Sequence, residues 1–264
     1  MRAKLDEVVM LLAIDIGNTD TTLGVFDGED LRATWHMATV IHRMPDEYAV
    51  LLLNLLHHQG LDQSDIKQAA LCSVVPPLIT TFGELFQRYF HISPLVVGAG
   101  VKTGVRIRMD NPREVGADRI VNAAAAHYLY GGPIIITDLG TATTFDTVSK
   151  EGDYLGGAIA PGLVTAADAL FTQAAMLPRV ELVHPTQVIG TNTIAAMQSG
   201  IVFGYVGLIE GVVARIQQEL GEKTKVVATG GYAELIAKET AVIDVVNPDL
   251  TLIGLRLVYL MNKA

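Results

Sequence analysis

The sequence predicts a mixed α/β protein built from two similar halves, and one repeated design carries most of that prediction. Residues 12–22 (LAIDIGNTDTT) and 134–144 (IIITDLGTATT) each join a short apolar run to Asp-x-Gly and then to a cluster of Asn or Thr. An apolar run of this length predicts a buried strand, and a glycine just beyond it lets the chain turn sharply. Asp15 and Asp138 lie 123 residues apart, close to half of the 264-residue chain. This spacing suggests two related halves that face each other across a nucleotide.

The two turns have the chemistry of phosphate sites. Thr and Asn side chains, together with backbone N–H groups freed by the turn, form a concavity that binds anions, and the Asp can hold a metal ion or water beside it. A single Asp-x-Gly is more often an ordinary hairpin corner. Two of them in matching contexts favour phosphate binding. A third candidate is Gly230-Gly231, which could let a nucleoside lie on the backbone, or could form only a tight strand-to-helix turn.

Composition narrows the class of protein. Half of the residues are apolar, which is enough to fill a substantial core. The chain should therefore fold without added cross-links such as disulfide bonds. The formal charge of −9 argues against generic binding to nucleic acid. An anionic ligand must therefore meet local positive charge, and one stretch supplies it, unless this stretch is only a solvated surface. Its basic residues are Lys102, Arg106, Arg108, Arg113 and Arg119.

Cysteine usage and hydropathy point to the cytoplasm. The single cysteine, Cys72, excludes an internal disulfide, fits a reducing compartment, and is expected to be a small buried apolar residue. The N-terminus lacks the long apolar region and cleavage site of a signal peptide. The longest uncharged stretch, residues 183–209, contains Pro, Gln, Asn and repeated Gly, so we do not expect it to span a membrane. A soluble cytoplasmic protein is predicted.

Each half is expected to run from a strand through its turn into a hairpin. In the first half, Asp27-Gly28 makes the hairpin turn, and Pro45 followed by two acidic residues opens a helix that stops at Gly60. In the second half, Gly131-Gly132-Pro133 ends an Ala-rich helix just before the repeated strand. The expected strands are 23–26, 31–37, 69–75, 95–97, 134–137, 145–149, 154–159, 226–228 and 242–245, and the expected helices are 48–58, 78–90, 115–130, 192–220, one ending at Lys238, and 248–262.

The long helix expected over 192–220 has glycine at spacings of three or four along one face, at Gly200, Gly204, Gly207 and Gly211. Each glycine inside a helix costs roughly 1 kcal/mol relative to alanine. Four of them on one face therefore imply close approach by a neighbouring backbone, either a strand or another subunit.

The segment 111–119 (NPREVGADR) joins the basic stretch to the Ala-rich helix. Asp118 and Arg119 are successive helix residues, so their side chains point about 100° apart and do not form a simple ion pair. One could address a reacting hydroxyl while the other grips a carboxylate with two hydrogen bonds, or the segment could be an ordinary capped first turn. Residues 98–104 fail the Walker pattern because no Gly precedes Lys102, and His57-His58 lacks a spaced third metal ligand.

These motifs resemble those of the type III pantothenate kinases. The shared segments are 15–19 (DIGNT), 116–119 (GADR), 138–143 (DLGTAT), Gly156-Gly157, Pro161-Gly162 and 190–193 (GTNT), in the family's order from about residue 11 to the C-terminus. The resemblance implies the α/β fold of the acetate and sugar kinases, heat-shock ATPases and actin, with two related domains and a nucleotide cleft between them. It also implies a homodimer. The corresponding halves would be 1–112 and 113–264, and the final helix could pack back on the first half.

The resemblance also implies the roles of individual residues in ATP-dependent phosphorylation of pantothenate. Asp118 would be the general base, Asp138 would bind a monovalent cation such as potassium or ammonium, and ATP would enter as its magnesium complex. The ATP-binding residues would be Asp15, Ile16, Gly17, Asn18, Thr19, Asp20, Thr21, Thr22 and Thr141. The pantothenate-binding residues would be Met109, Gly116, Ala117, Asp118, Arg119 and Thr191, with Arg119 on the carboxylate.

One position departs from the family's pattern. Met109 stands where the family usually has a tyrosine of the pantothenate pocket, and loss of a hydroxyl hydrogen bond could weaken binding by about 1 kcal/mol. A kinase for another small hydroxylated acid is therefore a second hypothesis. A third, a non-catalytic regulator with the same fold, is disfavoured because the residues expected to act in catalysis and binding are all present, namely Asp15, Asp118, Arg119, Asp138 and Thr141.

Overall fold

A computed structural model describes residues 9–263 of the chain. The residues before Met10 form an N-terminal extension for which the sequence suggests no role, and residues 1–8 lie outside the described part. The chain forms two compact units. Among the described residues, unit 1 takes 9–104, 113–125 and 251–263, and unit 2 takes 105–112 and 126–250. Each unit is built on its own mixed sheet, as the repeated design predicts.

The sheet of unit 1 has the strand order β3-β2-β1-β4-β5. β1 pairs antiparallel with β2 and parallel with β4, which places Asp15 opposite both Thr22 and Cys72. The strands are β1 (Met10–Ile16), β2 (Asp20–Asp27), β3 (Asp30–Ala38), β4 (Ile66–Ser73) and β5 (Leu95–Val96), and the helices of this part of the chain are α1 (Pro45–His58), η1 (Gln63–Asp65), α2 (Pro76–Leu85) and the π-helix η2 (Phe86–Phe90).

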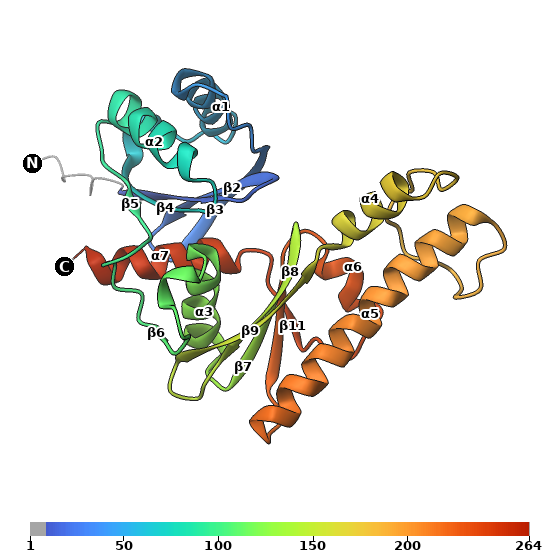
Figure 1. Cartoon of the computed structure of the whole chain (residues 1–264). Helices are drawn as coiled ribbons and strands as arrows, with labels where there is room; N and C mark the ends of the chain where they lie inside the picture. Colours follow the sequence, from blue (N-terminus) through green and yellow to red (C-terminus); the bar gives the residue numbers. More distant parts are fainter. Residues whose placement is uncertain (1–8, 264) are drawn as a thin grey trace, which may run out of the picture. The chain divides into compact units, whose positions relative to one another are not determined.

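Helices cover both faces of this sheet (Figure 1). Leu12 and Ile14 of β1 point into the core formed with α1 and α2. Leu11 and Ala13 point the other way, because side chains alternate along a strand, and they pack against α7 (Leu250–Asn262). Gly254 of α7 lies so close to the backbone of α3 (Ala117–Tyr130) that an added Cβ would come within 2.2 Å of the Val121 carbonyl oxygen.

The sheet of unit 2 has the order β11-β10-β7-β8-β9-β6. β7 and β8 form the antiparallel hairpin that carries the second Asp-x-Gly turn, and β10 runs parallel to β7. The strands are β6 (Arg106–Ile107), β7 (Ile134–Leu139), β8 (Ala142–Val148), β9 (Asp153–Pro161), β10 (Lys225–Thr229) and β11 (Val245–Val246), and the helices are η3 (Pro112–Glu114), α4 (Leu163–Gln173), α5 (Thr193–Leu220) and α6 (Ala233–Ala237).

α5 is the long helix expected from the sequence, and Asn192 caps it by accepting a hydrogen bond from Ala195 N. Among the residues that the structure describes, it is the one helix long and apolar enough to cross a membrane. One of its faces, including Val202, Ile209 and Val213, is buried in the core of unit 2 against the sheet. This packing explains its apolar character as that of a core helix.

The structure corrects several sequence-based expectations. No atom of the described chain lies within 4 Å of a Cβ built on Gly200, Gly204 or Gly207, so the interpretation of a packed strand along that face is wrong. The last strand is Val245–Val246 rather than 242–245. The helix α4 and the short strand β6 were not predicted.

Candidate active site

The first Asp-x-Gly turn lies at the end of β1. Gly17 N donates to Asp20 O at 3.0 Å, and a Cβ on Gly17 would lie 2.9 Å from that same oxygen, so only glycine fits this tight turn. Asn18, Thr19 and Asp20 are exposed at the tip. Thr21 is buried and its hydroxyl lies 2.9 Å from that of Thr39.

The remaining members of the expected ATP-binding set flank this tip. Ile16 is fully buried in the core, so only its backbone is available to a ligand. Thr22 Oγ1 lies 3.1 Å from His36 Nδ1. The tip residues and these two neighbours therefore present backbone groups and hydroxyls at one end of the sheet, as a phosphate site requires.

The carboxyl group of Asp15 is buried at this turn. Burial is the main cause that raises its pKa from 3.8 to about 7, and the negative charges of Asp118 and Asp20 contribute to the same shift. The Cys72 thiol opposes this effect by donating a hydrogen bond to Asp15 Oδ1 at 3.0 Å. In turn, burial and the nearby Asp15 charge raise the pKa of Cys72.

Cys72 is thus buried, as the sequence suggests. Its thiol also donates a hydrogen bond to Asp15, which was not predicted from the sequence. Its only signal in the sequence is its place near the end of an apolar run, equivalent to that of Asp15 in the first run. The parallel register of β1 and β4 makes the two residues neighbours.

Asp118 lies in the first turn of α3, where a helix N-terminus favours negative charge. Its Oδ1 atom is buried and has no hydrogen-bond partner in the described part of the chain. A Cβ on Gly116 would lie 2.4 Å from that oxygen, so the glycine is what allows the carboxylate to sit there. Ala117 packs beneath it in the core that includes α7, and Arg119 is half-buried.

The second Asp-x-Gly turn, at the end of β7, is enclosed by glycines from two other segments. A Cβ on Gly162 would lie 2.3 Å from the carbonyl oxygens of Gly140 and Thr141, and Thr165 Oγ1 donates to Thr141 O at 2.8 Å. A Cβ on Gly230, where φ is +88°, would lie 2.6 Å from Asp138 Oδ1. The glycine after β10 therefore does contact this turn, whereas Gly231 has open space around it.

The other two residues expected to bind pantothenate lie elsewhere in unit 2. Met109 follows β6, and its sulfur lies 2.9 Å from where a Cβ of Gly156 would be. Thr191 is exposed, one residue before the N-cap of α5. The loop before it is fixed by Gly190, where a Cβ would lie 2.3 Å from Ala196 N.

The chemistry of these groups fits the cations that a kinase needs. In the described residues, no group of three His, Cys, Asp or Glu side chains could hold a metal ion. Mg²⁺ needs no such group, because it is held by one or two carboxylates together with substrate phosphates and water. Asp15, a buried carboxyl group beside the first turn, fits that part. At the second turn, Asp138 Oδ1 lies against the Gly230 backbone.

Two α/β units, each with an Asp-x-Gly turn between its first two antiparallel strands, define a protein of the fold shared by acetate and sugar kinases, heat-shock ATPases and actin. Solved structures support this predicted fold. EutJ from Carboxydothermus hydrogenoformans has a TM-score of 0.57 at 16% identity, over 96% of this chain and 93% of its own. The ROK hexokinase from Thermus thermophilus has a TM-score of 0.51 at 15% identity, over 97% and 100%.

Sequence comparison gives the family. The profile of the type III pantothenate kinases matches residues 11–215. Type III pantothenate kinases from Dehalococcoides mccartyi (strain 195) and Moorella thermoacetica are 61% and 55% identical to this chain, covering 96% of it and 98% and 100% of their own lengths. The chain belongs to the type III pantothenate kinase family and is a phosphotransferase, which confirms the resemblance seen in the motifs.

The raised pKa of Asp15 predicts how stability depends on pH. Between pH 3.8 and about 7 the folded chain keeps a proton on Asp15 that the unfolded chain has released, so the free energy of unfolding falls as pH rises through this window. Asp15→Asn removes the effect. Relative to the wild type, the variant should gain on the order of 1–4 kcal/mol between pH 4 and pH 8, at 1.36 kcal/mol per pKa unit.

Urea unfolding of both proteins across this range, without nucleotide or magnesium, measures the difference, in which the titration of all other groups cancels. Unfolding free energies that differ by the same amount at every pH would contradict the assignment.

Proposed function

We propose that this chain transfers the γ-phosphoryl group of ATP to the primary hydroxyl of pantothenate, the first step of coenzyme A synthesis, with Asp118 as general base. The observation that carries the proposal is the buried, unpartnered Oδ1 of Asp118 in a chain that belongs to this family. A carboxylate oxygen with no partner has a lone pair available for the proton of an incoming hydroxyl.

In the proposed reaction, Asp118 Oδ1 accepts the hydroxyl proton as the new P–O bond forms and the bond to the β-phosphate oxygen of ATP breaks. Arg119 holds the pantothenate carboxylate with paired hydrogen bonds. The backbone N–H groups and hydroxyls of 15–22, with Thr141, hold the ATP phosphates. Asp15 would hold the Mg²⁺ of the nucleotide complex, which would supply neutralisation of the phosphate charge. Positioning and charge neutralisation suffice for this chemistry.

Two alternatives are weighed against this proposal. Met109, with its thioether in place of the family's usual phenol, supports a kinase for another small hydroxylated acid. A regulator is disfavoured, although the chain also resembles a conserved putative Baf family transcriptional activator from Campylobacter jejuni, with a TM-score of 0.60 and 18% identity over 96% of this chain and 98% of that one. Likeness at that identity supports the fold alone. We further propose a cytoplasmic location, in keeping with a biosynthetic role.

The Asp118→Asn variant tests the base. It should fold and bind ATP but lose about tenfold or more in kcat, because a general base contributes about 10²–10⁴ in rate. The measurement is release of ADP from magnesium-ATP in potassium buffer, with and without pantothenate, for the wild type and the variant.

No pantothenate-dependent release by the wild type at millimolar pantothenate would overturn the proposed substrate. A comparison with other hydroxylated acids would then identify the preferred one. Near-normal kcat in the variant would instead remove Asp118 from the role of base.

Asp138 is proposed to bind a monovalent cation, potassium or ammonium. Its carboxylate lies at the end of β7 against the Gly230 backbone, and its ionised oxygens suit such a cation. Replacing potassium by tetramethylammonium at constant ionic strength should lower kcat in the wild type and have little further effect in Asp138→Asn. Equal rates of the wild type in both salts would rule out this role.

A homodimer is proposed from the surface of unit 2. The glycine face of α5 is exposed, and the segment between α4 and α5 exposes apolar side chains, among them Met176 and Ile189, which are 91% and 82% exposed. Exposed apolar surface of this kind marks an interaction site. Sedimentation velocity should give about twice the chain mass of 28.3 kDa.

Gly204→Gln should shift the protein toward the monomer. The matched control is Gly83→Gln on α2, since neither glycine has an atom within 4 Å of a built Cβ in the described chain. A wild type that sediments as a monomer, or two variants that behave alike, would contradict the proposed interface.

A further inference from the structure

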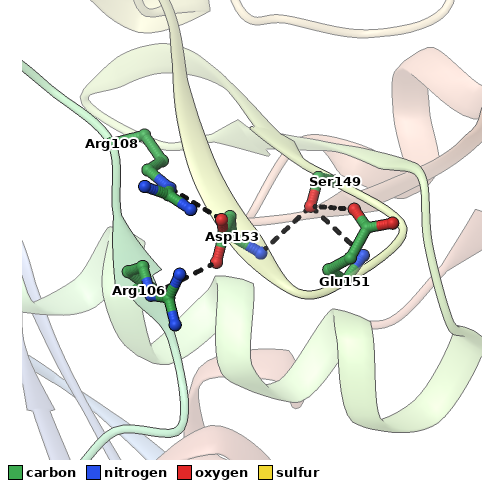
Figure 2. Close-up of polar contacts among 5 residues, drawn as sticks. All are labelled: Arg106, Arg108, Ser149, Glu151 and Asp153. Carbon is green, nitrogen blue, oxygen red and sulfur yellow. Dashed lines mark hydrogen bonds and ion pairs between the residues drawn. The ribbon is translucent and has the colours of Figure 1, made fainter.

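Two of the basic residues in 102–119 already pair with a carboxylate of the protein itself. Arg106 and Arg108 both turn to one carboxylate, that of Asp153 at the start of β9 (Figure 2). Arg108 Nε lies 2.7 Å from Asp153 Oδ2, and Arg106 Nε lies 3.9 Å from Oδ1. The Asp153 side chain is 19% exposed, against 70% and 52% for the two arginines.

Asp153 is itself held in place by the hairpin that carries it. Ser149 Oγ accepts hydrogen bonds from the backbone N–H groups of Glu151 and Asp153, both at 3.2 Å, and donates to Glu151 Oε2 at 3.0 Å (Figure 2). The carboxylate is therefore a fixed anchor, whereas the arginines come from a strand with little pairing of its own.

β6 is short and lies at the edge of its sheet. Its pairing with β9 joins Arg106 to Asp153 and Ile107 to Tyr154, and Arg108 N donates to Tyr154 O at 2.8 Å. Two paired residues give a strand little stability of its own, so side-chain contacts must contribute to its position.

Met109 follows this strand closely and lies against β9. Its sulfur lies 2.9 Å from where a Cβ of Gly156 would be. Gly156 stands next to an irregularity in the pairing of β9, where Thr147 pairs with Gly156 and Val148 pairs with Tyr154. This part of β9 is held in place by the buried Tyr154 hydroxyl, which donates to the buried Asp146 carboxylate at 2.5 Å.

We propose that Asp153, through its ion pairs with Arg106 and Arg108, is a positioning residue that holds Met109 in place for binding of the acid substrate. The ion pairs hold Arg106 and Arg108 against the start of β9, and the Met109 sulfur, one residue beyond Arg108, then lies against Gly156. A Cβ at position 156 would lie 2.9 Å from that sulfur, and φ there is +116°, which favours glycine. Gly156 therefore leaves the space in which the Met109 sulfur packs. The inference rests on the proposed function, in which Met109 contacts pantothenate.

The test combines hydrogen exchange with steady-state kinetics on the wild type, Asp153→Asn and Asp153→Glu. In Asp153→Asn, amides of 105–110 should exchange faster, and KM for pantothenate should rise roughly three- to fivefold, the upper range for a partly exposed ion pair. kcat and KM for ATP should stay near the wild-type values. Asp153→Glu, which keeps the carboxylate, should bring the exchange rates and KM for pantothenate back toward those of the wild type.

The matched control is Asp27→Asn, which removes the exposed Arg32–Asp27 pair of 3.3 Å in unit 1 and should change none of these values. Added salt should raise KM for pantothenate in the wild type more than in Asp153→Asn, because it screens the pair that the variant lacks.

Faster exchange in Asp153→Asn with an unchanged KM would show that the ion pair is structural only, and unchanged exchange would show that it does not hold the strand; either result overturns the proposal. Failure of the proposed function has a different signature, namely a wild type without pantothenate-dependent ADP release. The exchange rates, which need no substrate, then decide whether Asp153 holds the strand.

Discussion

The burial of the Asp15 carboxyl group at the end of β1 is the constraint on which the site in unit 1 depends. Burial is the main cause that raises its pKa, and the negative charges of Asp118 and Asp20 act in the same direction. The Cys72 thiol, a weak hydrogen-bond donor, opposes them. A buried carboxylate is costly unless a positive or hydrogen-bonding partner compensates it, and such groups gather at functional sites.

Glycine solves the complementary steric problem. At Gly116, Gly162 and Gly230, a single methyl group would collide with a carboxylate or with the backbone of a turn. These three residues come from segments far apart in the sequence, yet each lies against an Asp-bearing segment. The protein therefore brings backbone within van der Waals distance of its functional carboxylates, and it leaves no room for side chains that would fill the site.

Local features were predictable from the sequence, and contacts between distant strands were not. The two turns, their hairpins and α5 were predicted because strand periodicity, Gly and the Asn192 cap act over a few residues. α4 was missed because its N-cap is Gly162, which makes no side-chain capping bond. The bonds of Cys72 to Asp15 and of Arg108 to Asp153 depend on strand register across 57 and 45 residues, which no local pattern encodes.

The position of α7 has a consequence for the order in which the chain folds during synthesis. Leu252, Leu255 and Val258 cover the face of the unit 1 sheet that carries Leu11 and Ala13, and they come from the last 13 residues. During synthesis, β1 therefore keeps one apolar face uncovered until α7 has been made. Nearly all of unit 2 precedes α7 in the chain. The core of unit 2 can therefore form before the core of unit 1 is covered, although unit 1 contains the earlier strands.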